Sequence, residues 1–206
     1  MKPSNKRVFF SDYVFNVLEN VYEPAEDSFL FAENLAIRED DVVLDMGTGC
    51  GILGVIAAEK ASKVLSVDIN PYAVRCAKEN ARLCGVPGKF FFLQCDLFSA
   101  IRAGERFDVI LFNAPYLPSK NVDDGSWLGR AWSGGVAGRQ IIDRFISEAP
   151  KYLKQDGHIL LMQSTLSDLG ETLAKFEEND LRASVVAKRD LPFFETIVLV
   201  KARCQK

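Results

Sequence analysis

The sequence predicts an α/β protein with a Rossmann-like, seven-stranded and mostly parallel sheet, covered by helices on both faces. From about residue 41 onward, short apolar strand-like segments alternate with helix-like segments, which is typical of parallel crossover units. The composition is 48% hydrophobic and 26% charged over 206 residues, as in ordinary globular domains. We therefore expect a single domain over residues 1–206, with residues 1–40 as an N-terminal extension that includes a helix.

The first half of the alternation begins with the strand "DVVLDM" and ends with the phenylalanine-rich strand "KFFFLQC". One helix between them opens with Pro71 and closes before Gly85, at the positions where these residues favour helix ends. The expected elements are strands at residues 41–46, 63–69 and 89–95 and helices at residues 52–60 and 71–84.

The second half begins with the strand "FDVILFN". Its expected elements are strands at residues 107–113, 158–164, 183–188 and 195–202 and helices at about 138–153 and 166–179. Two segments fall outside the alternation. Pro24 opens a helix whose first turn carries Glu26 and Asp27, which is favourable at the positive end of the helix dipole. Residues 114–137 hold both tryptophans and lack periodicity, and a loop of this length is usually functional.

Charge and cysteine usage exclude several classes of protein. The net charge of −3 and a pI near 5.3 argue against a basic surface for nucleic acid. Five cysteines without a CxxC pair favour reduced thiols and no zinc site. Neither a signal-peptide core nor an apolar run long enough for a membrane is present. We expect a cytoplasmic protein without a metal.

The stretch "VVLDMGTGCGILG" predicts a cofactor site. It is a strand ending at Asp45, followed by Gly47, Gly49 and Gly51 in the pattern GxGxG and then by a helix. Glycines allow a sharp turn and close approach of a ligand to the backbone. The dinucleotide fingerprint requires a glycine where this chain has Ile52. An acidic residue before the turn suits a nucleoside with a cationic amino-acid tail, which indicates S-adenosylmethionine.

Acidic residues also end the next two strands. Asp68 lies about twenty residues past the glycines, where a carboxylate accepts hydrogen bonds from both ribose hydroxyls. Asp96 is placed to accept from an adenine amino group, and Leu97 to pack on the ring. A single Asp after a strand is as often a turn former or helix cap. Together with the glycine turn, however, the three carboxylates favour a cofactor crevice at the carboxyl ends of the strands.

The strand "FDVILFN" continues into Asn113-Ala114-Pro115-Tyr116. An Asn-X-Pro sequence can simply end a strand. Alternatively, the Asn113 side-chain oxygen and the Ala114 carbonyl are two acceptors that can hold the two hydrogens of a planar NH2 group. Tyr116 can lie against that group, and Pro115 stiffens the turn. Methyl transfer from a sulfonium to a neutral amino nitrogen depends mainly on alignment, so no strong base is required.

With these motifs the chain resembles class I S-adenosylmethionine-dependent methyltransferases, in particular the short archaeal and eukaryotic form of the HemK-like release factor glutamine methyltransferases. The stretches that carry the resemblance are "VYEPAEDSFL", "DMGTGCG", "VDINPYAV", "CDLF", "NAPYLP" and "AWSGGVAGRQIIDRF". The resemblance implies methylation of the glutamine side-chain nitrogen in a Gly-Gly-Gln loop. It places Ser28, Asp45, Gly47, Asp68, Asp96 and Leu97 at the cofactor, with the N-terminal helix packing on that site, and Asn113 to Leu117 at the target amide.

The chain departs from the family pattern in one residue and is shorter than the bacterial enzymes. The family usually has Asn-Pro-Pro-Tyr, and Ala114 replaces the first proline, which preserves the carbonyl acceptor but loses stiffness. Only about forty residues precede the first predicted strand, whereas bacterial members carry a helical domain that grips the release factor. The resemblance therefore implies a small zinc-binding activator subunit as partner. The strand "KFFFLQC" either pairs with a partner at a sheet edge or is an ordinary buried strand.

Three alternatives remain open on the sequence alone. Adenine-N6 methyltransferases of DNA or RNA share the tetrad chemistry, although this acidic chain lacks a basic surface. A cofactor-binding regulatory subunit with weakened activity is suggested only by Ala114. In "AWSGGVAGRQ", Arg139 either positions substrate on a flexible lid or belongs to the glycine-rich start of a helix.

Overall fold

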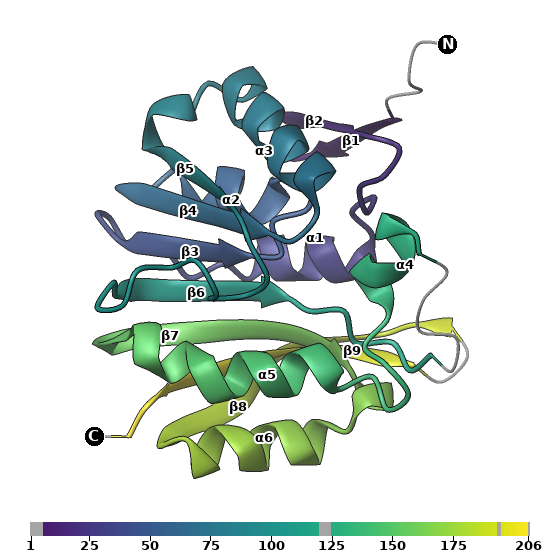
Figure 1. Ribbon diagram of the computed structural model, residues 1–206, viewed down its shortest axis with the longest axis vertical. Helices are drawn as coiled ribbons and strands as arrows, with labels where there is room; N and C mark the ends of the chain where they lie inside the picture. The colour runs from purple at the N-terminus through teal and green to yellow at the C-terminus, as the bar shows by residue number, and fades with distance from the viewer. Residues whose placement is uncertain (1–5, 120–124, 193–194, 206) are drawn as a thin grey trace. The chain divides into compact units, whose positions relative to one another are not determined.

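The computed structural model describes residues 6–119, 125–192 and 195–205. By its internal contacts the chain divides into two compact units, Met1–Ala100 and Ile101–Lys206. Figure 1 follows the first unit in purple to teal and the second in teal to yellow. The expectation of a single domain stays a prediction.

The first unit opens with a β-hairpin that the periodicity analysis did not predict. The antiparallel strands β1 (Lys6–Phe10) and β2 (Tyr13–Val17) pair in register around a two-residue turn. Ser11, the first residue of that turn, has a positive φ of 50°, which is typical of tight hairpin turns. The helix α1 (Glu26–Glu33) follows, with Glu26 and Asp27 in its first turn as predicted; it begins two residues after Pro24.

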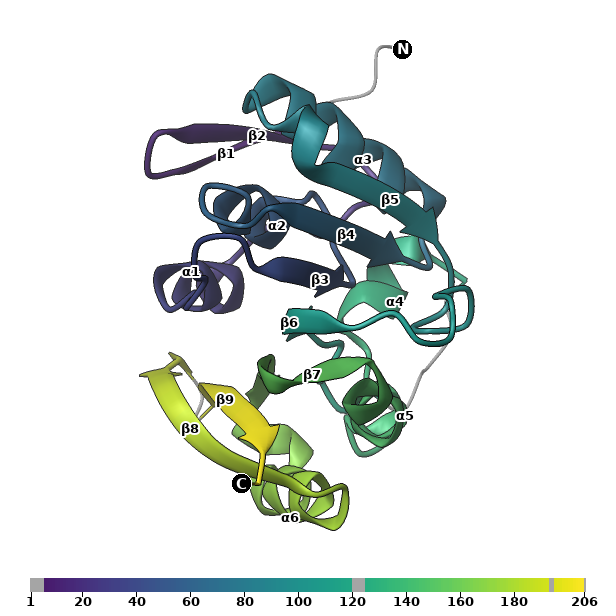
Figure 2. The ribbon, with the colours of Figure 1, turned by 90° about the vertical axis from the view of Figure 1, so that its left-hand side faces the viewer.

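Three parallel strands form the sheet of the first unit, in the order β5-β4-β3. They are β3 (Val42–Met46), β4 (Lys63–Asp68) and β5 (Phe90–Gln94), and the helices of this part are α2 (Ile52–Ala57), α3 (Pro71–Leu83) and the 3-10 turn η1 (Pro87–Lys89). Helix α3 packs against β2, β4 and β5 (Figure 2). Asn70 caps it by accepting a hydrogen bond from the Tyr72 N–H, and Pro71 takes the first helical position, as the sequence predicts.

The second unit contains four strands in the order β6-β7-β9-β8. Strand β6 (Phe107–Asn113) is parallel to β7 (Leu153–Ser164), whereas β9 (Thr196–Cys204) is antiparallel to both β7 and β8 (Leu181–Asp190). The helical elements are α4 (Trp127–Trp132), α5 (Gln140–Glu148), α6 (Leu169–Glu178) and the 3-10 turns η2 (Ala149–Tyr152) and η3 (Thr165–Ser167). The two units together supply the seven strands that the sequence predicts.

Helix α5 anchors the second unit through one apolar stripe. Ile142, Phe145 and Ile146 are fully buried at helical spacing. The Phe145 ring lies 4.6 Å from the ring of Phe112 in β6, measured between centroids, at a tilt of 42°. This packing fixes the strand that ends at Asn113. Helices α5 and α6 lie side by side (Figure 1).

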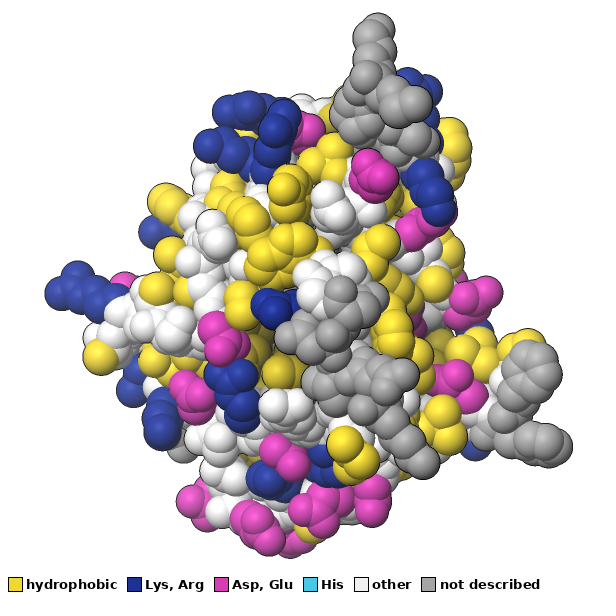
Figure 3. Space-filling view, turned by 45° about the vertical axis from the view of Figure 1, so that its right-hand side comes forward, with side chains coloured by type: hydrophobic (Ala, Val, Ile, Leu, Met, Phe, Trp, Pro, Cys, Tyr) yellow, Lys and Arg dark blue, Asp and Glu magenta, His cyan; other side chains and the backbone are white. Residues whose placement is uncertain are grey.

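The surface shows charges of both signs. On the face in Figure 3, Lys and Arg side chains lie in small groups among Asp and Glu side chains, with hydrophobic side chains exposed between them. Among the described residues, no helix combines the length and apolar character that a membrane span requires.

Candidate cofactor and acceptor sites

The predicted glycine turn connects β3 to α2 and has the backbone conformation that glycine permits. Gly47, Gly49 and Gly51 have φ angles of 63°, 55° and 87°, values that other residues adopt only at a cost. Gly51 also needs its small size, because a Cβ atom there would lie 3.0 Å from both Cα and Cβ of Ala77 in α3. The sharp turn that the sequence predicts is therefore present. A side chain at Gly51 would collide with Ala77 of α3.

Asp68 ties the glycine turn to the end of β4. The Gly49 N–H donates to Oδ2 of Asp68 at 3.0 Å, and the Asn70 N–H donates to Oδ1 at 2.9 Å. Desolvation raises the pKa of Asp68, while these two N–H groups oppose the rise. The residue remains partly exposed. Because each carboxylate oxygen has more than one lone pair, both still have acceptor capacity for the hydroxyls of a ribose.

Asp45 lies behind the turn rather than on an open surface. It is 1% exposed, and the Thr48 hydroxyl donates to its Oδ2 at 2.5 Å. Burial raises the pKa of Asp45 to about 7, and the nearby charge of Asp68 adds to the rise. Helix α2 approaches the same carboxylate closely: a Cβ atom on Gly54 would lie 2.8 Å from Oδ2. Gly54 was not singled out in the sequence, although it follows the GxGxG pattern by three residues.

Asp96 and Leu97 follow β5 by two and three residues. The Cys95 N–H donates to the Asp68 carbonyl at 3.1 Å, so the ends of β4 and β5 are held together, as the parallel register predicts. Leu97 is buried with a φ of 47°, which is unusual for a side chain of this size. The structure thus brings the predicted strand-end residues Asp68 and Asp96 into one neighbourhood of the first unit.

Ser28 is buried in the first turns of α1 beside Asp27. Its N–H donates to Oδ1 of Asp27 at 2.6 Å and its hydroxyl donates to the same atom at 3.2 Å. The Tyr22 hydroxyl donates to this oxygen as well, at 3.3 Å. Asp27 therefore organises the segment that the resemblance assigns to the cofactor pocket, a role that its position in a helix first turn did not reveal.

Sequence reasoning also missed Asn80, a fully buried polar residue of α3. Its amide nitrogen donates to the carbonyls of Asn16 in β2 and Cys50 in the glycine turn, both at 2.8 Å. Its amide oxygen accepts from the Asn16 N–H at 2.9 Å. One side chain thus connects the N-terminal hairpin, α3 and the turn. In the sequence, the available signal was an asparagine at a helix position that otherwise carries apolar residues.

The second unit places the tetrad at the end of β6, as predicted. Asn113 is the last residue of the strand and pairs in register with Met162 of β7. Ala114 and Tyr116 are buried, and Pro115 is partly exposed. The lone histidine, His158, is buried in β7. The roles assigned to the tetrad stay predictions.

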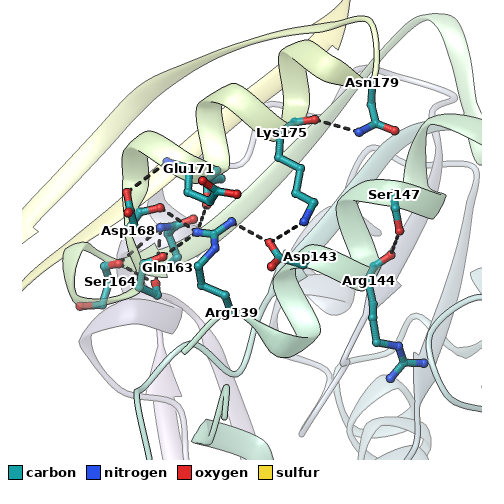
Figure 4. Close-up of polar contacts among 12 residues, drawn as sticks. Arg139, Asp143, Arg144, Ser147, Gln163, Ser164, Asp168, Glu171, Lys175 and Asn179 are labelled. Atoms are coloured by element: carbon teal, nitrogen blue, oxygen red, sulfur yellow. Dashed lines mark hydrogen bonds and ion pairs between the residues drawn. The ribbon is translucent and has the colours of Figure 1, made fainter. Parts of the chain in front are cut away.

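The hypothesis that Arg139 positions substrate on a flexible lid is wrong. Arg139 is only 8% exposed, and its guanidinium donates to oxygens of Ser167, Asp168, Thr172 and Asp143 (Figure 4). These partners occupy both of its terminal nitrogens, so the residue joins the start of α5 to the start of α6. The alternative, a glycine-rich helix start, is confirmed.

The geometry agrees with comparisons to known proteins. The family model "Methyltransferase small domain" matches residues 22–127. A Methanocaldococcus jannaschii relative described as "Putative protein N5-glutamine methyltransferase MJ0928" is 45% identical over 181 residues, which cover 87% of this chain and 90% of the relative.

The chain belongs to the methyltransferase small domain family. Its predicted HemK-like character is also confirmed: the human "Methyltransferase HEMK2" is 29% identical over 82% of this chain and 84% of its own length. This methyltransferase also matches the structure of the E. cuniculi Mtq2–Trm112 complex, described as responsible for methylation of the eRF1 translation termination factor. That match has a TM-score of 0.66 and 26% identity and covers 90% of this chain and 99% of the other.

A more distant neighbour supports the class I fold alone. The T. thermophilus 16S rRNA N2 G1207 methyltransferase, solved with AdoMet and guanosine, aligns with a TM-score of 0.74 at 19% identity, over 99% of this chain and 50% of the other. The predicted fold class is therefore confirmed.

Proposed function

We propose that this methyltransferase transfers a methyl group from S-adenosylmethionine to the side-chain amide nitrogen of glutamine in the Gly-Gly-Gln loop of a peptide chain release factor. The observation that carries the proposal is Asn-Ala-Pro-Tyr at the end of β6, in a chain 45% identical to a relative described as an N5-glutamine methyltransferase. The similarity to the Mtq2–Trm112 complex supports a release factor as the acceptor.

The residues of the first unit fit S-adenosylmethionine. When bound, this cofactor supplies an electrophilic methyl group on a sulfonium. The glycine turn leaves its backbone open to close approach, and a side chain there would be strained or obstructed. Asp68 would accept hydrogen bonds from the ribose hydroxyls, Asp96 would accept one from the adenine amino group, and Leu97 would pack on the adenine ring. Ser28 lines the pocket from α1. When ionised, Asp45 would balance the charge of the cationic amino-acid tail, and its burial means that water screens this attraction only weakly.

Asn113 and Ala114 orient the acceptor in this proposal. The two acceptor oxygens, on the Asn113 side chain and the Ala114 backbone, hold both hydrogens of the target amide. The two acceptors would stabilise the positive charge that develops on nitrogen as the N–C bond forms and the sulfonium S–C bond breaks. S-adenosylhomocysteine would leave, and one N–H proton of the amide would be released to water. Tyr116 packs against the plane of the amide.

The first experiment measures transfer of labelled methyl from S-adenosylmethionine to purified release factor, with duplex and single-stranded DNA and RNA as control acceptors. Label on the Gly-Gly-Gln glutamine supports the proposal. Label on nucleic acid alone would assign the acceptor to adenine, and tight cofactor binding without any transfer would favour a regulatory subunit.

Asn113→Ala tests the acceptor role directly. Loss of a group that stabilises the transition state costs on the order of 100-fold or more in kcat, so we expect at least that loss with the dissociation constant for S-adenosylmethionine nearly unchanged. Asn179→Ala is the matched control, because the Asn179 side-chain amide donates to the Lys175 carbonyl at the end of α6. Wild-type turnover by Asn113→Ala would contradict the catalytic assignment.

We also propose that a small zinc-binding activator subunit binds at the edge strand β5. In the described part of the chain β5 pairs only with β4, and Phe91 is 57% exposed. A free strand edge with an exposed aromatic side chain fits β-augmentation by a partner, and the alternative of an ordinary buried strand is wrong. Phe91→Asp should abolish co-purification with the activator. Phe9→Asp is the control, because Phe9 is also largely exposed, at 68%, but lies on the β1–β2 hairpin. Equal loss in both variants would refute this location.

A further inference from the structure

The backbone that follows the tetrad is paired with a second segment of the same unit. The Leu117 N–H donates to the Trp132 carbonyl, the Gly134 N–H donates to the Leu117 carbonyl, and the Ser119 N–H donates to the Gly135 carbonyl, each at 2.9 Å. Leu117 and Ser133 form a parallel bridge. The chain that follows Asn113 to Tyr116, here called the acceptor turn, is therefore held at Leu117 and Ser119 and is not a free loop.

Two glycines bring this second segment against the tetrad itself. A Cβ atom on Gly134 would lie 2.7 Å from the Pro115 carbonyl oxygen. A Cβ atom on Gly138, whose φ is +71°, would overlap the Tyr116 carbonyl oxygen. Residues 134–138, here called the glycine brace, thus pack directly on the backbone of the last two tetrad residues. A side chain at either glycine would displace the turn.

Arg139 fixes the far end of the glycine brace. Its Nη1 lies 2.6 Å from the Ser167 carbonyl, 2.7 Å from the Asp168 carbonyl and 2.9 Å from the Thr172 hydroxyl. Its Nη2 donates to Asp143 Oδ1 at 2.7 Å. Figure 4 shows the guanidinium between α5 and the start of α6. A cation buried this deeply is tolerated only with such partners, and its planar fork holds several acceptors in one geometry.

We propose that the glycine brace, anchored by Arg139, is a positioning element that holds the Ala114 carbonyl and Tyr116 in their reactive arrangement. The inference rests on the proposed function, and it assigns to packing the stiffness that the usual proline supplies at position 114. Arg139 is thus a positioning residue that acts through the backbone of residues 134–138 and not by touching the acceptor. A displacement of the turn by about 1 Å can reduce turnover by about 100-fold.

The test compares Arg139→Ala and Arg139→Lys with Lys175→Ala. Lys175 lies 3.3 Å from the same Asp143 carboxylate but has no described contact with residues 134–138, so it controls for loss of a cation from this cluster. We expect kcat for the release factor to fall by about 10- to 100-fold in Arg139→Ala, with an unchanged dissociation constant for S-adenosylmethionine. Arg139→Lys should retain an intermediate rate, and Lys175→Ala the wild-type rate.

Two further measurements separate positioning from general stability. Hydrogen exchange at the Leu117 and Ser119 amides should accelerate in Arg139→Ala at a temperature where each variant is fully folded. Ala114→Pro should restore more kcat in the Arg139→Ala background than it adds to the wild type, because it replaces the lost stiffness. If Arg139→Ala does not fold, Gly134→Ala gives the same two readouts from the other end of the brace.

The outcomes are distinguishable. Faster exchange at Leu117 with an unchanged kcat would overturn the inference while leaving the proposed function intact, as would equal losses in Arg139→Ala and Lys175→Ala. A wild-type enzyme that binds S-adenosylmethionine but transfers no methyl to the release factor would overturn the proposed function, and this inference with it.

Discussion

Replacing Asp45 with asparagine should change how the stability of the protein depends on pH. Burial raises the pKa of this carboxyl from 3.8 to about 7 in the folded protein. A shift of one pKa unit corresponds to about 1.4 kcal/mol, so complete ionisation of Asp45 reduces the free energy of unfolding by about 4 kcal/mol. Asparagine has the same shape and still accepts a hydrogen bond from the Thr48 hydroxyl, but it carries no charge between pH 5 and pH 8.

The sign follows from which state releases its proton first. The unfolded chain ionises near pH 4, whereas the folded protein keeps Asp45 protonated until about pH 7. The favourable contribution of the protonated carboxyl is therefore complete below about pH 4 and is lost as the pH rises to about 7. Between pH 5 and pH 8 the wild type should lose about 2 to 3 kcal/mol relative to Asp45→Asn.

Urea unfolding of both proteins at pH 5, 6, 7 and 8, without cofactor, measures this difference. Asp41→Asn is the control, because Asp41 is buried just before the same strand and accepts from the Arg38 N–H at 2.8 Å. The neutral amide is a weaker acceptor for that bond, so this variant should be less stable than the wild type. A difference between Asp45→Asn and wild type that stays constant from pH 5 to pH 8 would refute the reasoning.

The same variant tests whether the destabilising charge has a function. If Asp45 balances the cationic tail of S-adenosylmethionine, the Asp45→Asn variant should bind the cofactor more weakly than the wild type at pH 8. This is also the pH at which the variant gains most stability relative to the wild type. Calorimetric titration at pH 8 measures this. Unchanged affinity would leave the buried carboxyl without its proposed electrostatic role.

Two further predictions concern the first unit. Asn80→Ala leaves the Asn16 and Cys50 backbone groups without their buried partner, so it should cost about 2 to 4 kcal/mol in urea unfolding and weaken S-adenosylmethionine binding; wild-type affinity in a destabilised variant would separate Asn80 from the turn. Gly54→Ala places a Cβ atom 2.8 Å from Asp45 Oδ2 and 3.1 Å from the Phe90 ring, and we expect a loss of about 1 to 3 kcal/mol from overpacking despite the better helix propensity of alanine. A more stable Gly54→Ala would show that α2 can move away from the sheet.

The elements that could be predicted from sequence are those whose pattern is local. The helix at Pro71–Leu83 matches its prediction to within one residue, because its cap, its proline and its apolar stripe all lie within the segment. The strand ending at Asn113 is also confirmed. The β1–β2 hairpin was missed because its strands of five residues flank the non-glycine turn Ser11-Asp12, which lacks the usual Asn-Gly or Asp-Gly signal. Helix α4, six residues within a glycine-rich segment, was too short to give a period.

The supports of the two sites could not be predicted, for a physical reason that both share. Asn80 and Arg139 are polar residues whose partners lie up to 64 residues away for Asn80 and 33 residues away for Arg139. In the hydrophobic pattern of the sequence, such residues are visible only as interruptions of an apolar helix face or as charges near the start of a helix. Their contacts depend on which backbone groups the fold leaves without a partner, and the turns that carry function are where such groups occur.

This common cause has an experimental consequence. Asn80 donates to the glycine turn that we assign to the cofactor, whereas Arg139 holds the segment that packs on the acceptor turn. Asn80→Ala should therefore raise the dissociation constant for S-adenosylmethionine, and Arg139→Ala should lower kcat without changing that constant. Both variants could instead change the dissociation constant and kcat in proportion to their loss of stability. In that case the two residues would be structural supports of the fold, and the assignment of Asn80 to cofactor binding and of Arg139 to turnover would be wrong.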